Sequence, residues 1–333
     1  MGQVDTIGDR AVRLMKERLA RLRKREAELQ HDPSPETVHQ LRVATRRLQA
    51  VLTTFRPVLE LPSDVRRRPL RRVERRLGRL RDLDVLSGAL DELADPSLSA
   101  PALMKLGALQ QHLVAQRPAL VRRAELAVGR RGFRRLLARL GDWLEAPSLT
   151  ATAGFPCETA APDLLLPRLA RVLLHPGWRL PSLPPPGAPE AATLHALRRR
   201  VKTLRYGVEC FETLYGEPVT TWLAELHEIQ DALGRHHDAS VLLEQLPPGV
   251  GSSDLRERVV VTAGAAVAGW SAWQARYDGT AGRTGLQLLL SSPPPAAPPP
   301  ASSDADTDHN EVQPPLPEEN HSDLVSTQAD GGI

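Results

Sequence analysis

The stretches VHQLRVATRRLQAVLTTFR (residues 38–56) and LHALRRRVKTLRYGVECFE (residues 194–212) are two copies of one pattern. Aligned at an offset of 156 residues, they share five identical residues. With the same offset and no gap, LGRLRDLDVL (residues 77–86) matches LGRHHDASVL (residues 233–242) at six positions. Because the spacing between the two motifs is unbroken in both halves, the sequence indicates a tandem duplication.

Each copy has the apolar spacing of a packed helix. In the first copy, side chains suited to a helix interface recur every three or four residues; they are Val38, Leu41, Thr45, Leu48, Leu52, Phe55 and Leu59. Ser34 and Pro35 supply an N-cap and a first helical residue. The same reasoning predicts an opening helix over residues 5–31 and a long one over 101–145, kinked at Pro118. In the second half it predicts helices over about 163–175, 190–215, 219–246 and 254–289.

The composition favours an all-α protein and excludes several other classes. Aromatic residues make up only 4% of the 333 residues, fewer than β-sandwiches and barrels usually contain. Two cysteines are too few for a disulfide scaffold or a tetrathiolate zinc site. No apolar run reaches the length of a membrane span, and the N-terminus lacks the apolar stretch of a signal peptide. We therefore expect a cytoplasmic protein with no membrane contact.

Two four-helix units and an acidic tail are the predicted organisation. Short connections favour antiparallel neighbours within each unit. The predicted boundaries are 1–146 for the first unit, 147–161 for a linker, 162–290 for the second unit and 291–333 for the tail. The tail is rich in Pro and Ser, with eight acidic and no basic residues, which is typical of a disordered segment.

Positive charge is concentrated in the first half and predicts a polyanionic partner. Residues 1–150 contain 30 Lys and Arg against 18 Asp and Glu, although the whole chain carries a net charge of only +3. Basic side chains also recur in a stripe beside each apolar seam: His39, Arg42, Arg46 and Gln49, and then His195, Arg198, Lys202 and Arg205. Each stripe spans roughly 15 Å. A solvated polar face is the alternative interpretation of one such stripe, but its recurrence with His at the head favours a repeating anion as ligand.

The second motif adds further charged candidates. It contains Arg79, Arg81 and Asp82 in the first copy, and Arg235, His237 and Asp238 in the second. We expect Asp82 and Asp238 to orient neighbouring basic side chains or to cap or face solvent. Arg71, Arg72, Arg75 and Arg76 extend the basic surface upstream.

The HxLRxxxRRL and HxLRxxxKxLRY segments, with the two LGxxxDxxVL segments, resemble the CHAD family, the conserved-histidine α-helical domain. The resemblance covers about residues 5–285 and implies two four-helix bundles related by pseudo-twofold symmetry. It also implies a basic central groove that binds inorganic polyphosphate without catalysis, and recruitment of some members to polyphosphate granules. No cofactor or metal is implied. The candidate polyphosphate-binding residues are His39, Arg42, Arg46, Arg79, Arg81, His195, Arg198, Arg199, Lys202, Arg205, Tyr206, Arg235 and His237.

Three other functions remain open. The adjacent pair His237 and Asp238, with His195 and His227 upstream, suits a metal-dependent phosphohydrolase. The repeat argues against this, because Arg81 occupies the position of His237 in the first half and arginine is not a usual metal ligand. Arg stripes also suit a nucleic-acid backbone, although few aromatic residues accompany them for base stacking. The third alternative is a helical adaptor that receives an acidic protein segment.

Overall fold

The computed structural model describes residues 5–65, 67–246 and 252–293 and is helical over these ranges, with no β-strand among them. The all-α prediction is therefore confirmed. The first half contains α1 (Ile7–His31), α2 (Pro35–Thr54), α3 (Arg68–Leu93), α4 (Ala100–Val128) and α5 (Arg131–Glu145). The second half contains α6 (Cys157–Leu173), α7 (Ala191–Val208), α8 (Glu212–Tyr215), α9 (Glu217–Gln245), α10 (Ser252–Ala266), α11 (Trp270–Asp278) and α12 (Thr280–Ser291). Short 3₁₀ turns lie at Ala151–Gly154, Pro176–Arg179 and Glu209–Phe211.

The predicted start of the first motif helix is confirmed. α2 begins at Pro35, and the Ser34 side chain accepts a hydrogen bond from the backbone N–H of Thr37. This bond satisfies one of the N–H groups that a helix leaves unpaired at its first turn. The start of α2 fixes the register of every side chain that follows it, including His39 and Arg42.

Two of the longer predicted helices are divided in the structure. The stretch predicted as one helix over 101–145 ends at Val128 and restarts at Arg131, whereas Pro118 lies inside α4. A proline removes only one backbone hydrogen bond, so a helix held by packing on both sides can continue through it. The stretch predicted over 254–289 is likewise divided into α10, α11 and α12, with Gly279 between the last two.

The start of α6 differs from the predicted linker, whereas the predicted tail lies almost wholly beyond the part of the chain that the structure describes. α6 begins at Cys157, inside the stretch predicted as linker.

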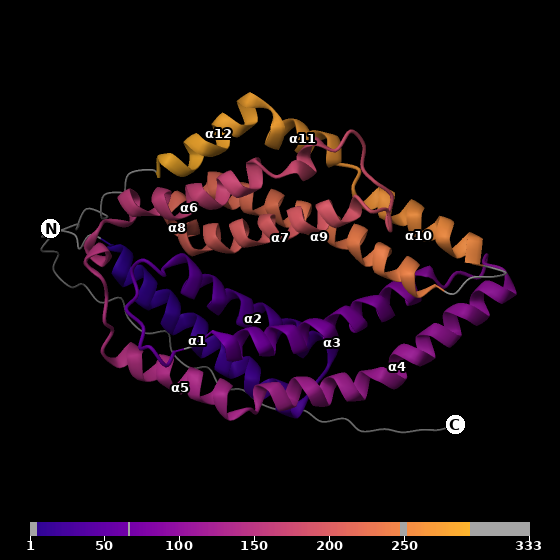
Figure 1. Ribbon diagram of the computed structural model, residues 1–333, viewed down its shortest axis with the longest axis horizontal. Coiled ribbons are helices and arrows are strands. Elements are labelled where there is room, and N and C mark those ends of the chain that lie inside the picture. The colour runs from indigo at the N-terminus through magenta and orange to yellow at the C-terminus, as the bar shows by residue number, and fades with distance from the viewer. Residues whose placement is uncertain (1–4, 66, 247–251, 294–333) are drawn as a thin grey trace, which may run out of the picture. The chain divides into compact units, whose positions relative to one another are not determined.

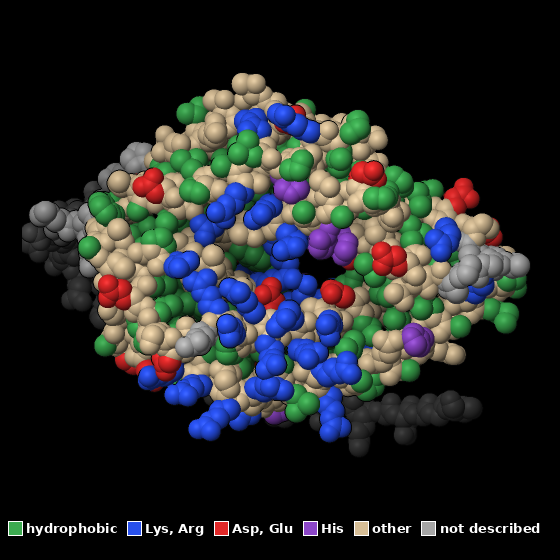
Figure 2. Space-filling view, in the orientation of Figure 1, with side chains coloured by type: hydrophobic (Ala, Val, Ile, Leu, Met, Phe, Trp, Pro, Cys, Tyr) green, Lys and Arg blue, Asp and Glu red, His purple; other side chains and the backbone are tan. Residues whose placement is uncertain are grey.

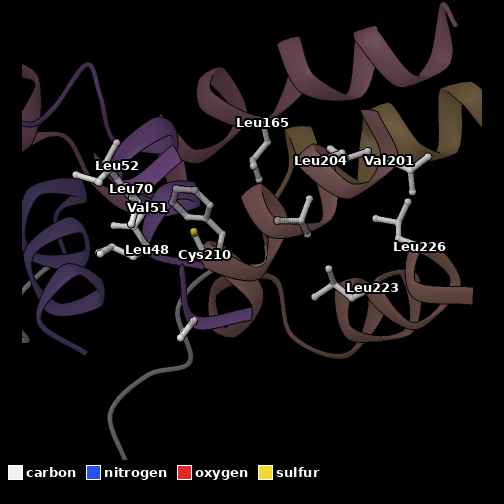
Figure 3. Packing of buried hydrophobic residues seen from close by; sticks show 14 of the residues in the cluster. Leu48, Val51, Leu52, Leu70, Leu165, Val201, Leu204, Cys210, Leu223 and Leu226 are labelled. Carbon is white, nitrogen blue, oxygen red and sulfur yellow. The ribbon is translucent and has the colours of Figure 1, made fainter. Parts of the chain in front are cut away.

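One hydrophobic core joins the two repeats. All seven seam residues of the first motif are buried, as the periodicity predicts. The equivalent residues Phe55 and Phe211 meet where the halves join, with ring centroids 5.4 Å apart. Figure 3 shows Leu48, Val51 and Leu52 of α2 beside Cys210 in this core, whose buried residues come from both halves. The repeats therefore fold against each other, with equivalent residues in contact.

A second apolar cluster joins the halves at a different place. It combines leucines from the later turns of α3 and the first turns of α4, such as Leu90 and Leu106, with Leu242 of α9 and Leu255 of α10. Between the two apolar contacts, α2 and α3 lie along one side of the middle of this helical unit, and α7 and α9 lie along the other (Figure 1). The charged stripes of the two motif helices lie in this middle region.

Candidate functional site

Figure 2 shows the molecule hollowed between the two halves, with Lys, Arg and His side chains gathered around the opening. We call this feature the central hollow. The basic stripes of α2 and α7 lie beside their buried seams, so His39, Arg42 and Arg46 from α2 are only partly exposed, as are Arg198 and Lys202 from α7. Partial burial distinguishes these side chains from an ordinary solvated helix face.

The two stripes lie close enough to act on each other electrostatically. The pKa of the Lys202 ammonium falls to about 6, first because the side chain is buried and then because Arg46 and Arg42 of the other half repel its charge. Burial also lowers the pKa of Arg42 to about 10, with Arg46 and, across the hollow, Arg198 contributing repulsion. The two stripes therefore face a shared space. The positive charges of each half make protonation of the basic side chains of the other half less favourable.

Carboxylates neutralise the two stripes unequally. On the first half, Arg46 Nε donates to Glu74 Oε1 at 3.3 Å, and Arg42 Nη2 lies 3.8 Å from Asp82 Oδ1. The Asp82 side chain is 74% exposed, so its contact with Arg42 is loose. Among the described residues, neither Arg198 nor Lys202 forms an ion pair with a carboxylate. On the second half, Arg198 is therefore a cation without a carboxylate partner, and Lys202, whose pKa is about 6, would be another once protonated.

The two sequence motifs interlock in the same way in each half. Arg198 lies across Gly234 of α9 and donates from Nε to the backbone oxygen of Gln230 at 3.2 Å. A Cβ at Gly234 would lie 2.8 Å from Arg198 Nη2. In the first half, Arg42 lies across Gly78, but a Cβ there would be 4.0 Å from its Nε. The glycine of each LG motif thus leaves room for the arginine of each HxLR motif.

The histidines at the heads of the stripes are held in the neutral form. The rings of His195 and His237 lie 4.0 Å apart between centroids, and the pKa of His195 falls to about 4 through burial and then repulsion from His237. Burial and then Arg81 lower the pKa of His39. His195 Nδ1 is buried with no hydrogen-bond partner among the described residues. Burial and the neighbouring cations therefore favour the neutral form of these imidazoles.

Two of the predicted polyphosphate-binding residues, Arg205 and Tyr206, are engaged in contacts within the protein. Arg205 pairs with Glu209, donates to Gln230 Oε1 at 3.1 Å and is only 11% exposed. Its guanidinium also stacks over the buried ring of Tyr206, 4.5 Å from the centroid. The alternative that Tyr206 packs, rather than donating to a phosphate, agrees with this burial.

The remaining candidates lie around the second motif or on the outer side of the stripe. Arg79, Arg199 and Arg235 are exposed and Arg81 is partly exposed, and none of their side chains forms an ion pair or hydrogen bond with another described residue. Asp238, expected to orient a base, has no hydrogen bond among the described residues, and burial raises the pKa of its carboxyl. Asp82 alone has the expected contact with an arginine.

The residues proposed for a metal site do not form a ligand cluster in the described part of the chain. No three His, Cys, Asp or Glu side chains there come together closely enough to hold a metal ion. His227 instead pairs with Asp231 on α9, with 2.8 Å between Nδ1 and Oδ2. The described ranges also contain no helix with both the length and the apolar character that crossing a bilayer requires.

A family model for the CHAD domain matches residues 13–247, which is most of the chain. The chain belongs to the CHAD family. The crystal structure of the CHAD domain from the plant Ricinus communis is 25% identical and aligns with a TM-score of 0.55 over 87% of this chain and 93% of that one. PptA from Streptomyces chartreusis is 18% identical, with a TM-score of 0.60 over 82% and 99% of the two chains, which shows a common fold. No curated protein sequence gives a significant match.

Sequence comparison of the repeats missed three residues that position the basic stripes of this CHAD domain. Glu74 and Gln230 occupy equivalent positions of the two halves and hold Arg46 and Arg205, respectively. Glu209 binds Arg205 and also approaches Arg47 of the other half at 3.4 Å. A search for identities could not find Glu74 and Gln230, because the two differ. The spacing of Arg205 and Glu209, four residues apart on one helix, was a signal that could have been used.

Proposed function

We propose that this CHAD domain binds inorganic polyphosphate in the central hollow and catalyses no reaction on it. The observation that carries the proposal is the pair of facing basic stripes, in which Arg198 and Lys202 lack a carboxylate partner among the described residues. Burial and then repulsion from Arg46 and Arg42 lower the pKa of Lys202 to about 6, and an anion placed between the stripes would relieve the repulsion.

The geometry supports an extended ligand rather than a single phosphate. Each stripe runs for several helical turns, and guanidinium groups bind phosphate oxygens through two parallel hydrogen bonds. Polyphosphate repeats a negative charge on every unit, so one chain can engage both stripes along their length. Recruitment of the protein to polyphosphate granules would follow where such granules are present.

Binding of long-chain polyphosphate should be tight and strongly dependent on salt. Contact with about five cations releases condensed counterions, so affinity should fall on the order of 100-fold between 50 and 200 mM salt. The test is to titrate long-chain polyphosphate, pyrophosphate and duplex or single-stranded DNA under identical conditions at several salt concentrations.

The expected order is long-chain polyphosphate first, with DNA and pyrophosphate well behind. Equal affinity for DNA would replace the proposal with nucleic-acid backbone binding. Release of phosphate that depends on added metal would replace it with hydrolysis.

Alanine at the two motif glycines should have opposite consequences for binding. Gly78→Ala leaves Arg42 in place and should stabilise α3 by about 0.5–1 kcal/mol, because alanine favours a helix. Gly234→Ala forces Arg198 to move and should lower polyphosphate affinity roughly fivefold at 0.1 M salt, the effect of one lost contact. Denaturant unfolding and polyphosphate titration of both variants provide the test. Equal affinities would show that the position of Arg198 over Gly234 has no role in binding.

A further inference from the structure

A second basic cavity is lined by residues of the first half. Its volume is about 980 Å³, and it is formed by the start of α3, the turn before α5 and the first turn of α5. Six arginines line it: Arg68, Arg71, Arg72, Arg75, Arg130 and Arg131. We call it the arginine cavity. Among the described residues that line it, Glu74 is the only acidic one.

The arginines of this cavity have no carboxylate partner among the described residues. None of the six side chains forms an ion pair or hydrogen bond with another described residue. By contrast, Arg139 donates to Asp64 at 2.8 Å, and Arg179 donates to Asp278 at 3.0 Å, although both arginines are well exposed. Six guanidinium groups around one cavity repel one another, and a bound anion would offset that repulsion.

The arginine cavity adjoins the central hollow. Gln49, the fourth position of the α2 stripe, lines the cavity, as does Glu74. Glu74 accepts a hydrogen bond from Arg46, which belongs to the stripe that faces Lys202. The Arg46–Glu74 pair therefore lies between the two spaces. Within this pair, Arg46 neutralises the carboxylate that Glu74 contributes to the cavity lining. Lys and Arg side chains continue from the hollow onto the half that carries α2 and α3 (Figure 2).

The equivalent positions of the second half do not carry the α3 arginines of the cavity. At the offset of 156 residues, Arg68, Arg71, Arg72 and Arg75 correspond to Ala224, His227, Glu228 and Asp231. His227 and Asp231 pair with each other there. The basic surface thus continues from the central hollow over the first half, where the α3 arginines line the cavity.

We propose that the arginine cavity is a second anion subsite, which holds the arm of a polyphosphate chain that emerges from the central hollow past Arg46. This inference rests on the proposed function and adds a direction to it: long chains leave over the first half, and short chains occupy the hollow alone. Affinity should therefore continue to rise with chain length after the hollow is filled.

The test compares two double variants that remove the same charge from the first half. Arg71→Ala/Arg75→Ala removes two cavity arginines that lie four residues apart on α3. Arg122→Ala/Arg123→Ala removes two exposed arginines of α4 that do not line the cavity. Each variant is titrated with tripolyphosphate and with long-chain polyphosphate at several salt concentrations.

The cavity variant should lose roughly 25-fold in affinity for the long chain at 0.1 M salt and keep wild-type affinity for tripolyphosphate. Its logarithmic salt slope for the long chain should fall by about 1.4, whereas the control keeps the wild-type slope. Equal long-chain affinity in the two variants would overturn the subsite and leave the hollow as the binding site. An equal loss for tripolyphosphate would also overturn it, by showing a general effect of charge. Failure of the wild-type protein to bind either ligand would reject both the subsite and the proposed function.

Discussion

Arg198→Glu is expected to reduce polyphosphate affinity on the order of 100-fold at 0.1 M salt. The substitution removes a cation from the central hollow and places a carboxylate beside Lys202 and opposite Arg42, where it would neutralise one of them and repel the ligand. Arg198 has no carboxylate partner among the described residues, so no salt bridge is lost. Equilibrium titration with long-chain polyphosphate measures the effect.

Arg200→Glu is the matched control, because Arg200 is an exposed residue of the same helix that lies outside the stripe. It makes the same change in net charge and should cost only a few-fold. Circular dichroism should show unchanged helicity in both variants. If Arg198→Glu unfolds the protein, Arg198→Gln removes the charge without reversing it and should still cost roughly tenfold in the folded state. Wild-type affinity in a folded Arg198 variant would contradict a role for Arg198 in binding.

Polyphosphate binding at pH 7.5 is expected to take up about one proton at Lys202. Without ligand its pKa is about 6, because the side chain is buried and Arg46, Arg42 and Arg198 repel its charge more than Glu74 attracts it. A polyphosphate chain between the stripes would raise that pKa. Between the pKa of the free protein and that of the complex, the affinity should therefore fall as pH rises, by up to about tenfold per pH unit.

Calorimetric titration in two buffers of different ionisation enthalpy measures this proton uptake. Lys202→Met keeps an unbranched side chain of similar length but cannot bind a proton, so it should lose the uptake and bind more weakly. Loss of affinity with unchanged proton uptake would assign the proton to another group. No uptake in the wild-type protein would contradict the presence of the ligand beside Lys202.

The low pKa of Lys202 should also make the stability of the unliganded protein depend on pH. An unfolded chain holds the Lys202 proton up to about pH 10.4, whereas the folded chain releases it near pH 6. Across this window the unfolded state binds more protons, so the free energy of unfolding should rise with pH, at up to about 1.4 kcal/mol per unit. Below pH 6 both states are protonated and the slope disappears. Lys202→Met should remove this contribution, and denaturant unfolding at several pH values would detect the difference.

The central hollow changes the pH dependence that sequence alone predicts. A histidine with its ordinary pKa would strengthen binding as pH falls below about 6.5. In the structure, burial and neighbouring cations lower the pKa values of His39, His195 and His237, that of His195 to about 4. The histidines should therefore contribute at lower pH, and Lys202 becomes the group that responds near neutrality.

The regular spacing of apolar and repeated residues allowed much of this fold to be predicted from the sequence. The seam from Val38 to Leu59, the Ser34 cap and the equivalence of Phe55 with Phe211 all depend on spacing within one helix or between identical copies. The duplicated motif that begins at His39 and His195 carried the resemblance to the CHAD family, which implied a basic groove between the two halves. These features are local or repeated, so one chain is enough to reveal them.

Contacts between helices that differ in the two copies could not be predicted. Glu74 holds Arg46 from a neighbouring helix, and its equivalent, Gln230, holds Arg198 and Arg205 instead. The low pKa of Lys202 depends on residues of the other half, whose distance no sequence pattern gives. The division of the 101–145 stretch at Gly129, rather than at Pro118, depends on packing around α4 and α5. Tertiary packing therefore determines which of the predicted cations remain available.

A crystal structure of the protein with a bound polyphosphate chain tests the central claim most directly. The account predicts one continuous chain between the halves, with phosphate oxygens within hydrogen-bond distance of Arg42 on α2 and of Arg198 and Lys202 on α7. A chain bound on the outer surface, or to one half alone with the central hollow unoccupied, would contradict it.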